Sequence, residues 1–207
     1  MRVRVKLCGI TRGEDAQIAV SLGIDALGFI FHEPSPRYIP PDAAGSIIAT
    51  LPPFVTAIGV FVDPSFEHLS QVVSRARLGA VQLHGAESPR FCSSIPIPVI
   101  KSFPVSDTFH PSMLDSYSCC SGYLLDTWNE SIKGGTGVTF DWRIAARVCE
   151  RYPGVLLAGG LGPSNLQEAL ECVHPYGIDL NSGVEISPGV KNPHKLRDAM
   201  QIIRSCS

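Results

Sequence analysis

Two side chains near the start of the chain could form a base held beside a cation. The segment Val3 to Thr11 favours a β-strand and runs directly into Cys8 and Gly9, as a strand that stops at a reactive group would. Because side chains alternate between the faces of a strand, Lys6 and Cys8 are expected to point the same way. A nearby ammonium lowers the pKa of a thiol and favours the thiolate, the form that acts as a base. Cys8 is therefore a candidate base, and the alternative is a small buried apolar residue.

Asp126 is a candidate for the matching acid. It ends the apolar segment Tyr123-Leu124-Leu125, and partial loss of hydration there would raise its pKa and keep some of it protonated. The alternative is an aspartate that caps a turn. In this scheme the acidic limb of the pH profile reports Cys8 and the basic limb reports Asp126. The loop Gly134-Gly135-Thr136-Gly137 follows and could fold over a ligand.

Two glycine-rich turns predict a phosphate site. Gly159 and Gly160 follow one apolar segment, and Ser182 and Gly183 follow the next. Backbone N–H groups that no Cβ obstructs can surround a phosphate, with or without the N-terminus of a short extra helix. The alternative is a pair of tight turns without a ligand.

Arg37 and His84 are candidates for the remaining contacts. Arg37 lies in a proline-stiffened loop, where a fixed guanidinium would suit a carboxylate, and the alternative is a solvated surface arginine. His84 shares a strand face with Gln82 and is expected to line the same site, although a structural hydrogen bond would explain it equally well.

Short strands alternate with single helices along the chain, and this order must position the candidate residues. Strands are expected near residues 3–8, 26–31, 56–62, 80–83, 99–103, 122–126, 155–158 and 178–181, and helices near 13–22, 41–50, 64–76, 87–94, 140–150, 164–173 and 193–204. Alternation implies a parallel sheet with right-handed crossovers, and eight units predict a compact α/β fold, a single (β/α)8 TIM barrel over residues 1–207. Residues 107–120 are rich in Ser and Pro, so the fifth helix should be short or distorted.

In such a barrel the active site lies at the C-terminal ends of the strands, where all the candidate residues fall. A chain of 207 residues with 44% apolar residues can fill one sizeable core. A net charge of −2 without a basic run argues against nucleic acid or a membrane surface as the main partner and favours a small molecule. We expect a monomer rather than a dimer.

The seven cysteines are an odd number with no C-x-x-C pair, so neither a disulfide framework nor a zinc site is expected. Together with a start that lacks an apolar signal core, they predict a cytoplasmic protein. The uncharged stretch Ala43 to Val62 has the length of a membrane span, but Gly and Pro residues interrupt it. It is expected to form a helix, a turn and a buried strand instead.

Several of these segments together resemble the phosphoribosylanthranilate isomerase family of tryptophan biosynthesis, in order and across nearly the whole chain. The matching segments are Lys6-Leu7-Cys8-Gly9-Ile10-Thr11, Gly28-Phe29-Ile30-Phe31, Ser35-Pro36-Arg37, Gln82-Leu83-His84-Gly85, Leu125-Asp126, Gly134-Gly135-Thr136-Gly137, Leu157-Ala158-Gly159-Gly160-Leu161 and Ser182-Gly183-Val184-Glu185. Asn181 departs from the family pattern, which usually has a small residue there, and this leaves the packing of the phosphate turn open.

The resemblance implies a cofactor-free and metal-free Amadori rearrangement of N-(5'-phosphoribosyl)anthranilate to 1-(2-carboxyphenylamino)-1-deoxyribulose 5-phosphate. It implies that Asp126 protonates the furanose ring oxygen and that Cys8 removes the C2' proton. Arg37 would hold the anthranilate carboxylate. The resemblance also implies that His84 and Asp179 contact the substrate and that Gly159, Gly160, Ser182 and Gly183 bind the phosphate.

Three alternatives stay open at this point. A related sugar isomerase of the histidine pathway uses an aspartate where this chain has Cys8, so an enzyme that serves both substrates is possible but disfavoured. A metal-dependent pentose-phosphate epimerase needs several His and Asp ligands at strand ends, and only His84 and Asp126 are convincing candidates. A non-catalytic sensor of phosphorylated sugars would need the phosphate turns, but not the acid and the base.

Overall fold

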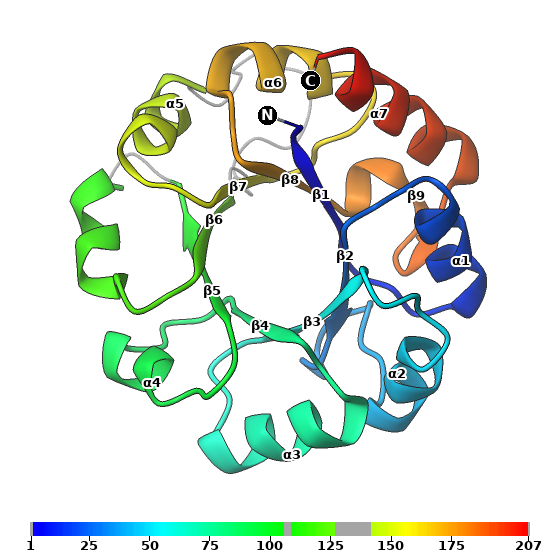
Figure 1. Ribbon diagram of the computed structural model, residues 1–207, viewed down its shortest axis with the longest axis vertical. Helices are drawn as coiled ribbons and strands as arrows, with labels where there is room; N and C mark the ends of the chain where they lie inside the picture. The colour runs from blue at the N-terminus through cyan, green and yellow to red at the C-terminus, as the bar shows by residue number, and fades with distance from the viewer. Residues whose placement is uncertain (1, 106–108, 127–141, 207) are drawn as a thin grey trace.

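The computed structural model, which describes residues 2–105, 109–126 and 142–206, contains eight parallel strands that close into a barrel (Figure 1). The strands are β1 (Arg4–Leu7), β2 (Ala26–Ile30), β3 (Thr56–Phe61), β4 (Ala80–Leu83), β5 (Val99–Pro104), β6 (Gly122–Asp126), β7 (Val155–Ala158) and β8 (Gly177–Leu180). Each strand pairs with its sequence neighbours, and β1 pairs with β8 through the register Lys6 to Asp179. The predicted (β/α)8 barrel is confirmed.

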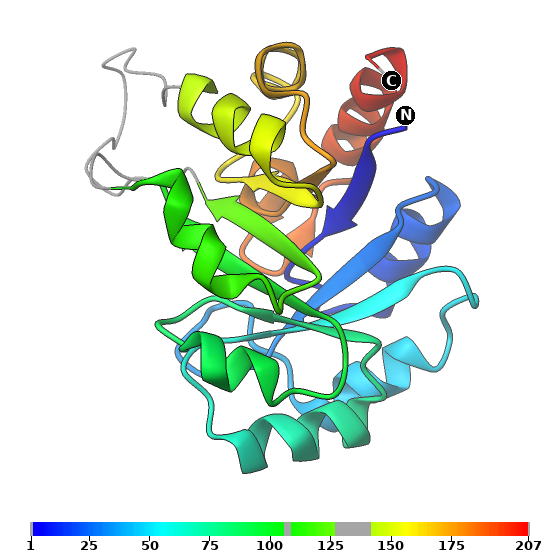
Figure 2. The same ribbon diagram turned by 60° about the vertical axis from the view of Figure 1, so that its left-hand side comes forward.

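Helices cover the outside of this ring (Figures 1 and 2). They are α1 (Gly13–Ser21), α2 (Pro41–Ile48), α3 (Phe66–Ala76), α4 (Pro89–Ser93), α5 (Trp142–Arg151), α6 (Leu166–Val173) and α7 (Pro193–Ser205). The ring closes where α7 lies beside α1 and Arg204 donates to the carbonyl of Leu22 at 2.6 Å.

The fifth crossover contains a 3-10 helix, η1 (Pro111–Tyr117), in place of an α-helix. Pro111 begins it, and the His110 ring accepts a hydrogen bond from the backbone N–H of Ser112. Serines compete with the helix for backbone hydrogen bonds, and proline provides no N–H, so a regular α-helix is disfavoured here. The expected short or distorted fifth helix is confirmed.

A small hairpin after β8 was not predicted. A single 3-10 turn, η2 (Ser182–Val184), leads into β9 (Glu185–Ser187) and β10 (Val190–Lys191), which pair antiparallel. These strands are too short for a periodic pattern to reveal them. The hairpin is attached to the β1–α1 segment, because Thr11 donates to Gly189 O at 2.6 Å and Lys191 N donates to Asp15 at 3.2 Å. It thereby brings Glu185 and Lys191 next to the end of β1.

Most of the core lies between the strands and the helices, where apolar residues from every strand pack against the helical layer. A second, smaller apolar cluster of Leu124, Leu156 and Ala158 with Ile100 faces the barrel interior. The interior also holds buried polar side chains, among them Lys6, Gln82, Ser102 and Asp179. This polar set matters for the site, since buried charges need partners.

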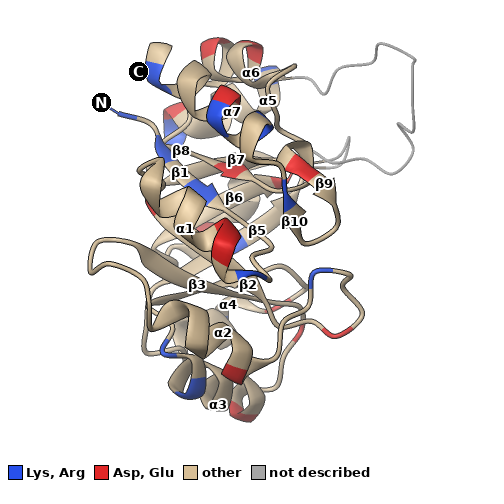
Figure 3. Ribbon diagram, turned by 90° about the vertical axis from the view of Figure 1, so that its right-hand side faces the viewer, with Lys and Arg blue, Asp and Glu red and all other residues tan. Residues whose placement is uncertain are grey.

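The uncharged stretch Ala43 to Val62 forms the end of α2, a turn and β3, as predicted. No helix within the described ranges has both the length and the apolar character to cross a membrane. Lys and Arg residues are interspersed with Asp and Glu in the side view of Figure 3, which agrees with the absence of a basic run in the sequence.

Candidate active site

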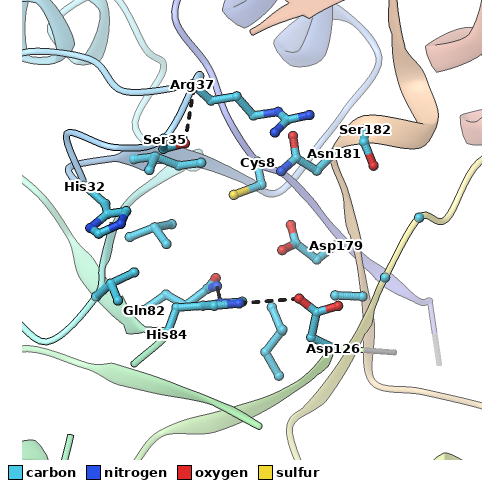
Figure 4. A pocket seen from close by; sticks show the side chains of 17 residues that line it. Cys8, His32, Ser35, Arg37, Gln82, His84, Asp126, Asp179, Asn181 and Ser182 are labelled. Carbon is cyan, nitrogen blue, oxygen red and sulfur yellow. Dashed lines mark hydrogen bonds and ion pairs between the residues drawn. The ribbon is translucent and has the colours of Figure 1, made fainter. Parts of the chain in front are cut away.

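A cavity of about 450 Å³ opens at the C-terminal ends of the strands. It is lined by Cys8, Ile30, His32, Ser35, Arg37, Val60, Val62, Gln82, His84, Leu124, Asp126, Ala158, Gly159, Gly160, Asp179, Asn181 and Ser182. Figure 4 shows that its labelled side chains converge from different strands and loops on one space. Eight of the nine predicted site residues therefore line this cavity, which we call the mouth of the barrel, and Gly183 is the exception.

Cys8 lies at the end of β1 beside a buried ion pair. Lys6 is 1% exposed and donates to both carboxylate oxygens of Asp179 at 2.9 Å, and its positive charge lies near enough to the Cys8 thiol to act on the pKa of that thiol. A Cβ at position 28 would lie 2.9 Å from Cys8 Sγ and 3.1 Å from Lys6 Cε, so Gly28 on the neighbouring strand makes room for both side chains. The prediction that Lys6 and Cys8 point the same way is confirmed.

The electrostatic balance at Cys8 differs from the prediction. Burial raises the pKa of the thiol, and the opposing effect of the Lys6 cation is too small to reverse it, partly because Asp179 raises the pKa as well. For Lys6 itself, burial is the largest single influence and favours the neutral form, but Asp179 and Cys8 together outweigh it and raise the pKa. The sequence showed the cation and could not show that a carboxylate shares it. Cys8 is thus a strong base of which little is ionised at neutral pH.

Asp126 is the last residue of β6 and faces His84, which directly follows β4. His84 Nε2 lies 3.4 Å from Asp126 Oδ2, and both side chains are partly exposed to the mouth. Gln82 is two residues before His84 on the same face of β4, and its amide nitrogen lies 3.1 Å from His84 Nδ1. The acid predicted from the sequence therefore lies at the end of a short chain of polar side chains (Figure 4).

Arg37 reaches the mouth from the β2–α2 loop and is held by Glu185. Its Nε donates to both oxygens of Glu185 at 3.0 and 3.1 Å, and its Nη2 donates to Oε2 at 2.7 Å. Burial opposes ionisation of Glu185, but hydrogen bonds from Arg37 and Lys191 outweigh burial and lower its pKa. Arg37 is therefore fixed along one edge of its guanidinium, and a solvated surface arginine is excluded.

Lys191 completes this cluster from β10. Its Nζ donates to Glu185 at 2.7 Å and to Asn181 at 3.0 Å, and burial lowers its pKa although Glu185 opposes the shift. Gly9 adopts a φ of +72°, and a Cβ there would lie 2.8 Å from both Arg37 Cδ and Asn181 Oδ1. Position 9 therefore needs glycine, because of its positive φ and because the side chains of Arg37 and Asn181 leave no space for a Cβ. Asn181, the departure from the family pattern, packs in this cluster.

The two predicted phosphate turns lie together, but their glycines differ in role. Gly159 and Gly160 line the mouth and adopt φ values of +103° and +64°, which favour glycine. A Cβ on Gly183, in contrast, would lie 2.1 Å from Leu161 O. A bulky residue at Gly183 would therefore disturb folding as well as any phosphate site. Gly183 packs backbone to backbone against the other turn, at Leu161 and Gly162.

The sequence reasoning missed the roles of Glu185, Lys191 and Gln82. Glu185 and Gln82 lay inside matched motifs without an assigned contact, and Lys191 follows Pro188-Gly189-Val190 in a segment with no clear periodicity. The loop Gly134 to Gly137 lies outside the described residues. Among the described residues, no group of three or more His, Cys, Asp or Glu side chains is placed to hold a metal ion.

Comparisons with known proteins agree on one family. The sequence model of the family "N-(5'phosphoribosyl)anthranilate (PRA) isomerase" matches residues 5–202. The chain is 48% identical to an N-(5'-phosphoribosyl)anthranilate isomerase of Geobacter metallireducens over 196 residues, which cover 95% of this chain and 96% of the relative.

Solved structures give the same result. A phosphoribosyl anthranilate isomerase from Thermotoga maritima superimposes with a TM-score of 0.91 at 40% identity, covering 98% of this chain and 99% of that one. A second isomerase structure, solved in complex with reduced 1-(o-carboxyphenylamino)-1-deoxyribulose 5-phosphate, has a TM-score of 0.88 at 38% identity and covers 98% and 99%.

Proposed function

The chain belongs to the N-(5'-phosphoribosyl)anthranilate isomerase family of tryptophan biosynthesis, and on this premise we propose how its own residues carry out the isomerisation. Cys8 acts as the general base and Asp126 as the general acid. The observation that carries the proposal is that one cavity is lined by a thiol directly after β1 and a carboxyl group at the end of β6, with anchoring groups in the loops around them.

The reaction needs one proton delivered and another removed. Asp126 protonates the furanose ring oxygen of N-(5'-phosphoribosyl)anthranilate, and the ring opens to a Schiff base. The Cys8 thiolate then removes the C2' proton, and the resulting enolamine tautomerises to the ketose product. The Lys6 cation supports the thiolate as it forms, since a buried anion without an opposite charge nearby would be costly.

Arg37 and the two turns hold the ends of the substrate. The Nη1 edge of Arg37, opposite the Nε–Nη2 edge that Glu185 holds, binds the anthranilate carboxylate. Ile30, Val60 and Val62 come from the neighbouring strands β2 and β3 and give the aromatic ring an apolar wall. The phosphate binds to the backbone at Gly159, Gly160 and Ser182, and His84 and Asp179 contact the sugar between the two ends.

Two single variants test the proposal. Cys8→Ser replaces an ionisable thiol with a hydroxyl that stays protonated, and Asp126→Asn keeps the shape while removing the transferable proton. Each should lower kcat by about 10²- to 10⁴-fold, the usual contribution of a positioned acid or base. Turnover is followed by loss of the phosphoribosylanthranilate fluorescence, and binding of a product analogue with unchanged circular dichroism shows that the site is intact. Retention of more than about a tenth of wild-type kcat in either variant contradicts the assignment.

The cellular setting and assembly are also proposals. All seven cysteines lie in described segments and are free thiols, which supports a reducing, cytoplasmic location.

The sequence predicts a monomer, whereas the Thermotoga maritima relative is described as dimeric. Phe54 is 95% exposed beside a cavity at the opposite end of the barrel from the mouth. Light scattering gives the molar mass of the wild-type protein in solution and so distinguishes a monomer from a dimer. If the wild type is a dimer and Phe54→Ser is a monomer, the prediction of a monomer is wrong and the interface includes Phe54.

A further inference from the structure

Gln82 is a buried amide at the base of the mouth with an unusual pattern of partners. It is 2% exposed, and its Nε2 lies 3.1 Å from His84 Nδ1 and 3.2 Å from Ser102 Oγ. Its Oε1 is buried and has no hydrogen-bond partner in the described part of the chain. An apolar side chain would fill this position without leaving a buried carbonyl unpaired, so folding stability does not explain the amide.

The two hydrogens of the amide account for its contacts. One points to Ser102 Oγ and the other to His84 Nδ1, which must then be an acceptor. In a neutral imidazole with an acceptor at Nδ1, the proton is on Nε2. The reversed amide would leave two buried N–H donors unpaired in place of one carbonyl. It would also direct the lone pair of Nε2 at a carboxylate, so the geometry favours the first arrangement.

The Nε2 proton of His84 faces the proposed acid. His84 Nε2 lies 3.4 Å from Asp126 Oδ2, and such contacts often shorten when a substrate binds. Oδ2 then acts as an acceptor, so the proton that Asp126 delivers is carried by Oδ1. One carboxyl group thereby has two distinguishable oxygens, one held by histidine and one that reacts.

We propose that Gln82 is a positioning residue that keeps the His84 proton on Nε2 and so orients Asp126 to deliver its proton from Oδ1. The inference rests on the proposed role of Asp126 as the acid. Gln82 acts through His84, and its contribution is expected in kcat more than in KM.

The state of the His84 ring tests this directly. In the ligand-free enzyme, long-range 1H–15N spectra of 15N-histidine-labelled protein, assigned with His84→Asn, should show the wild-type proton on Nε2. Gln82→Met removes the donor and should give a mixture of the two tautomers. Gln82→Glu places an acceptor at Nδ1 and should move the proton there, so that Nε2 presents a lone pair to Asp126.

Activity should follow the tautomer. Gln82→Met is expected to lower kcat about tenfold with KM changed less than about twofold, a smaller loss than that of the acid itself. Gln82→Glu should lose at least as much, because Nε2 then competes for the proton of Asp126. Ser102→Ala is the matched control, since it removes the other partner of the same amide, and it should keep the Nε2 tautomer and kcat within about twofold of wild type.

Two results would overturn the inference. The first is a Gln82→Met protein that keeps the Nε2 tautomer, whatever its kcat, because Gln82 would then not set the ring. The second is a Gln82→Glu protein with the proton on Nδ1 and wild-type kcat, since the tautomer would not matter for the acid. Asp126→Asn separates the two proposals: if it stays active, both fail, and if it is inactive while the Gln82 variants behave like wild type, only the role of Gln82 fails.

Discussion

Lys6 and Lys101 lie on opposite strands of the barrel, β1 and β5, and both are almost completely buried beside a carboxylate (Figure 1). Lys6 pairs with Asp179 inside the barrel, and its charge also acts on the Cys8 thiol. Lys101 pairs with Glu87 at 3.1 Å and lies 5.6 Å from the centre of the Phe103 ring, within the layer between strands and helices. The same residue type within a barrel strand therefore serves two different environments.

The remaining contacts of the two ammonium groups explain the difference. Lys101 donates to three backbone carbonyls, those of Leu83, Gly85 and Ser102, at 2.8 to 3.3 Å. Its partner Glu87 accepts from two backbone N–H groups in the neighbouring loops. That pair joins loops to one another. The Lys6 pair, in contrast, is in contact with the group proposed to react, so its electrostatics enter catalysis.

The largest expected effect is that of Lys6→Met. It leaves Asp179 buried without its cation, which should lower the free energy of unfolding by about 3 to 5 kcal/mol. It also removes the cation that supports the Cys8 thiolate, so kcat/KM at neutral pH should fall by roughly 10²-fold, as for loss of a donor at a developing anion. Urea unfolding and steady-state kinetics measure the two effects. Full activity in a folded Lys6→Met protein would show that the Lys6 pair, like the Lys101 pair, has no part in catalysis.

Lys101→Met should damage stability to a similar extent and leave catalysis almost unchanged. Glu87 would lose its cation and three carbonyls would lose a donor, for a loss of about 3 to 5 kcal/mol. At a temperature where the variant is folded, kcat/KM should stay within about threefold of wild type. Lys101→Met combined with Glu87→Gln should recover part of the stability. A selective loss of kcat would mean that Lys101 contributes to catalysis, in contrast to the structural role proposed for it here.

The period-two pattern of strands explains how much the sequence could predict here. Counting along β1 correctly placed Lys6 and Cys8 on one face, and the same count along β5 places Ser102 inside and Lys101 outside. The barrel, the mouth and most of its lining follow from such counting, because they depend on local periodicity and on the order of elements.

The contacts that cross the barrel could not be predicted in this way. Asp179 reaches Lys6 only because β8 closes onto β1, and Glu185 reaches Arg37 only because an irregular hairpin brings it there. No local pattern encodes the partner of a charge that is more than a hundred residues away. The sign of the shift at Cys8 was mispredicted mainly because burial raises the pKa of the thiol, and in smaller part because Asp179 raises it too.

Arg37→Lys should weaken substrate binding. Its effect on kcat/KM should lie between those of Lys6→Met and Lys101→Met. A lysine can reach Glu185 but cannot hold it along one edge and present a second planar edge to the substrate. We expect KM to rise about tenfold, equivalent to about 1.4 kcal/mol, with a small change in unfolding free energy. Steady-state kinetics with the full substrate provide the measurement. Unchanged kcat/KM would leave Arg37 without a role in recognising the carboxylate.

The pH dependence should shift with Lys6 and not with Lys101. Carboxyl groups ordinarily lose their protons well below thiols, and burial raises the pKa of Cys8 further. When the base has the higher pKa, the alkaline limb of kcat/KM reports the base, so we now assign that limb to Cys8 and expect it above the usual thiol value of about 8.5. Because Lys6 lowers the pKa of Cys8, Lys6→Met should move the limb upward. The profile of Lys101→Met should match wild type.

The smallest effect is expected at an exposed pair, which provides the baseline for both lysines. Arg75 of α3 forms hydrogen bonds and an ion pair with Asp42 of α2, and both side chains are more than half exposed. Water screens such a pair and solvates whichever partner remains, so Arg75→Met should cost no more than about 1 kcal/mol, part of it from the loss of a cation in the last helical turn. Lys6→Met and Lys101→Met make the same change in charge at buried sites. If urea unfolding gave three equal losses, burial would not distinguish these pairs, and the large effects expected for Lys6 and Lys101 could not be attributed to carboxylates left without a partner.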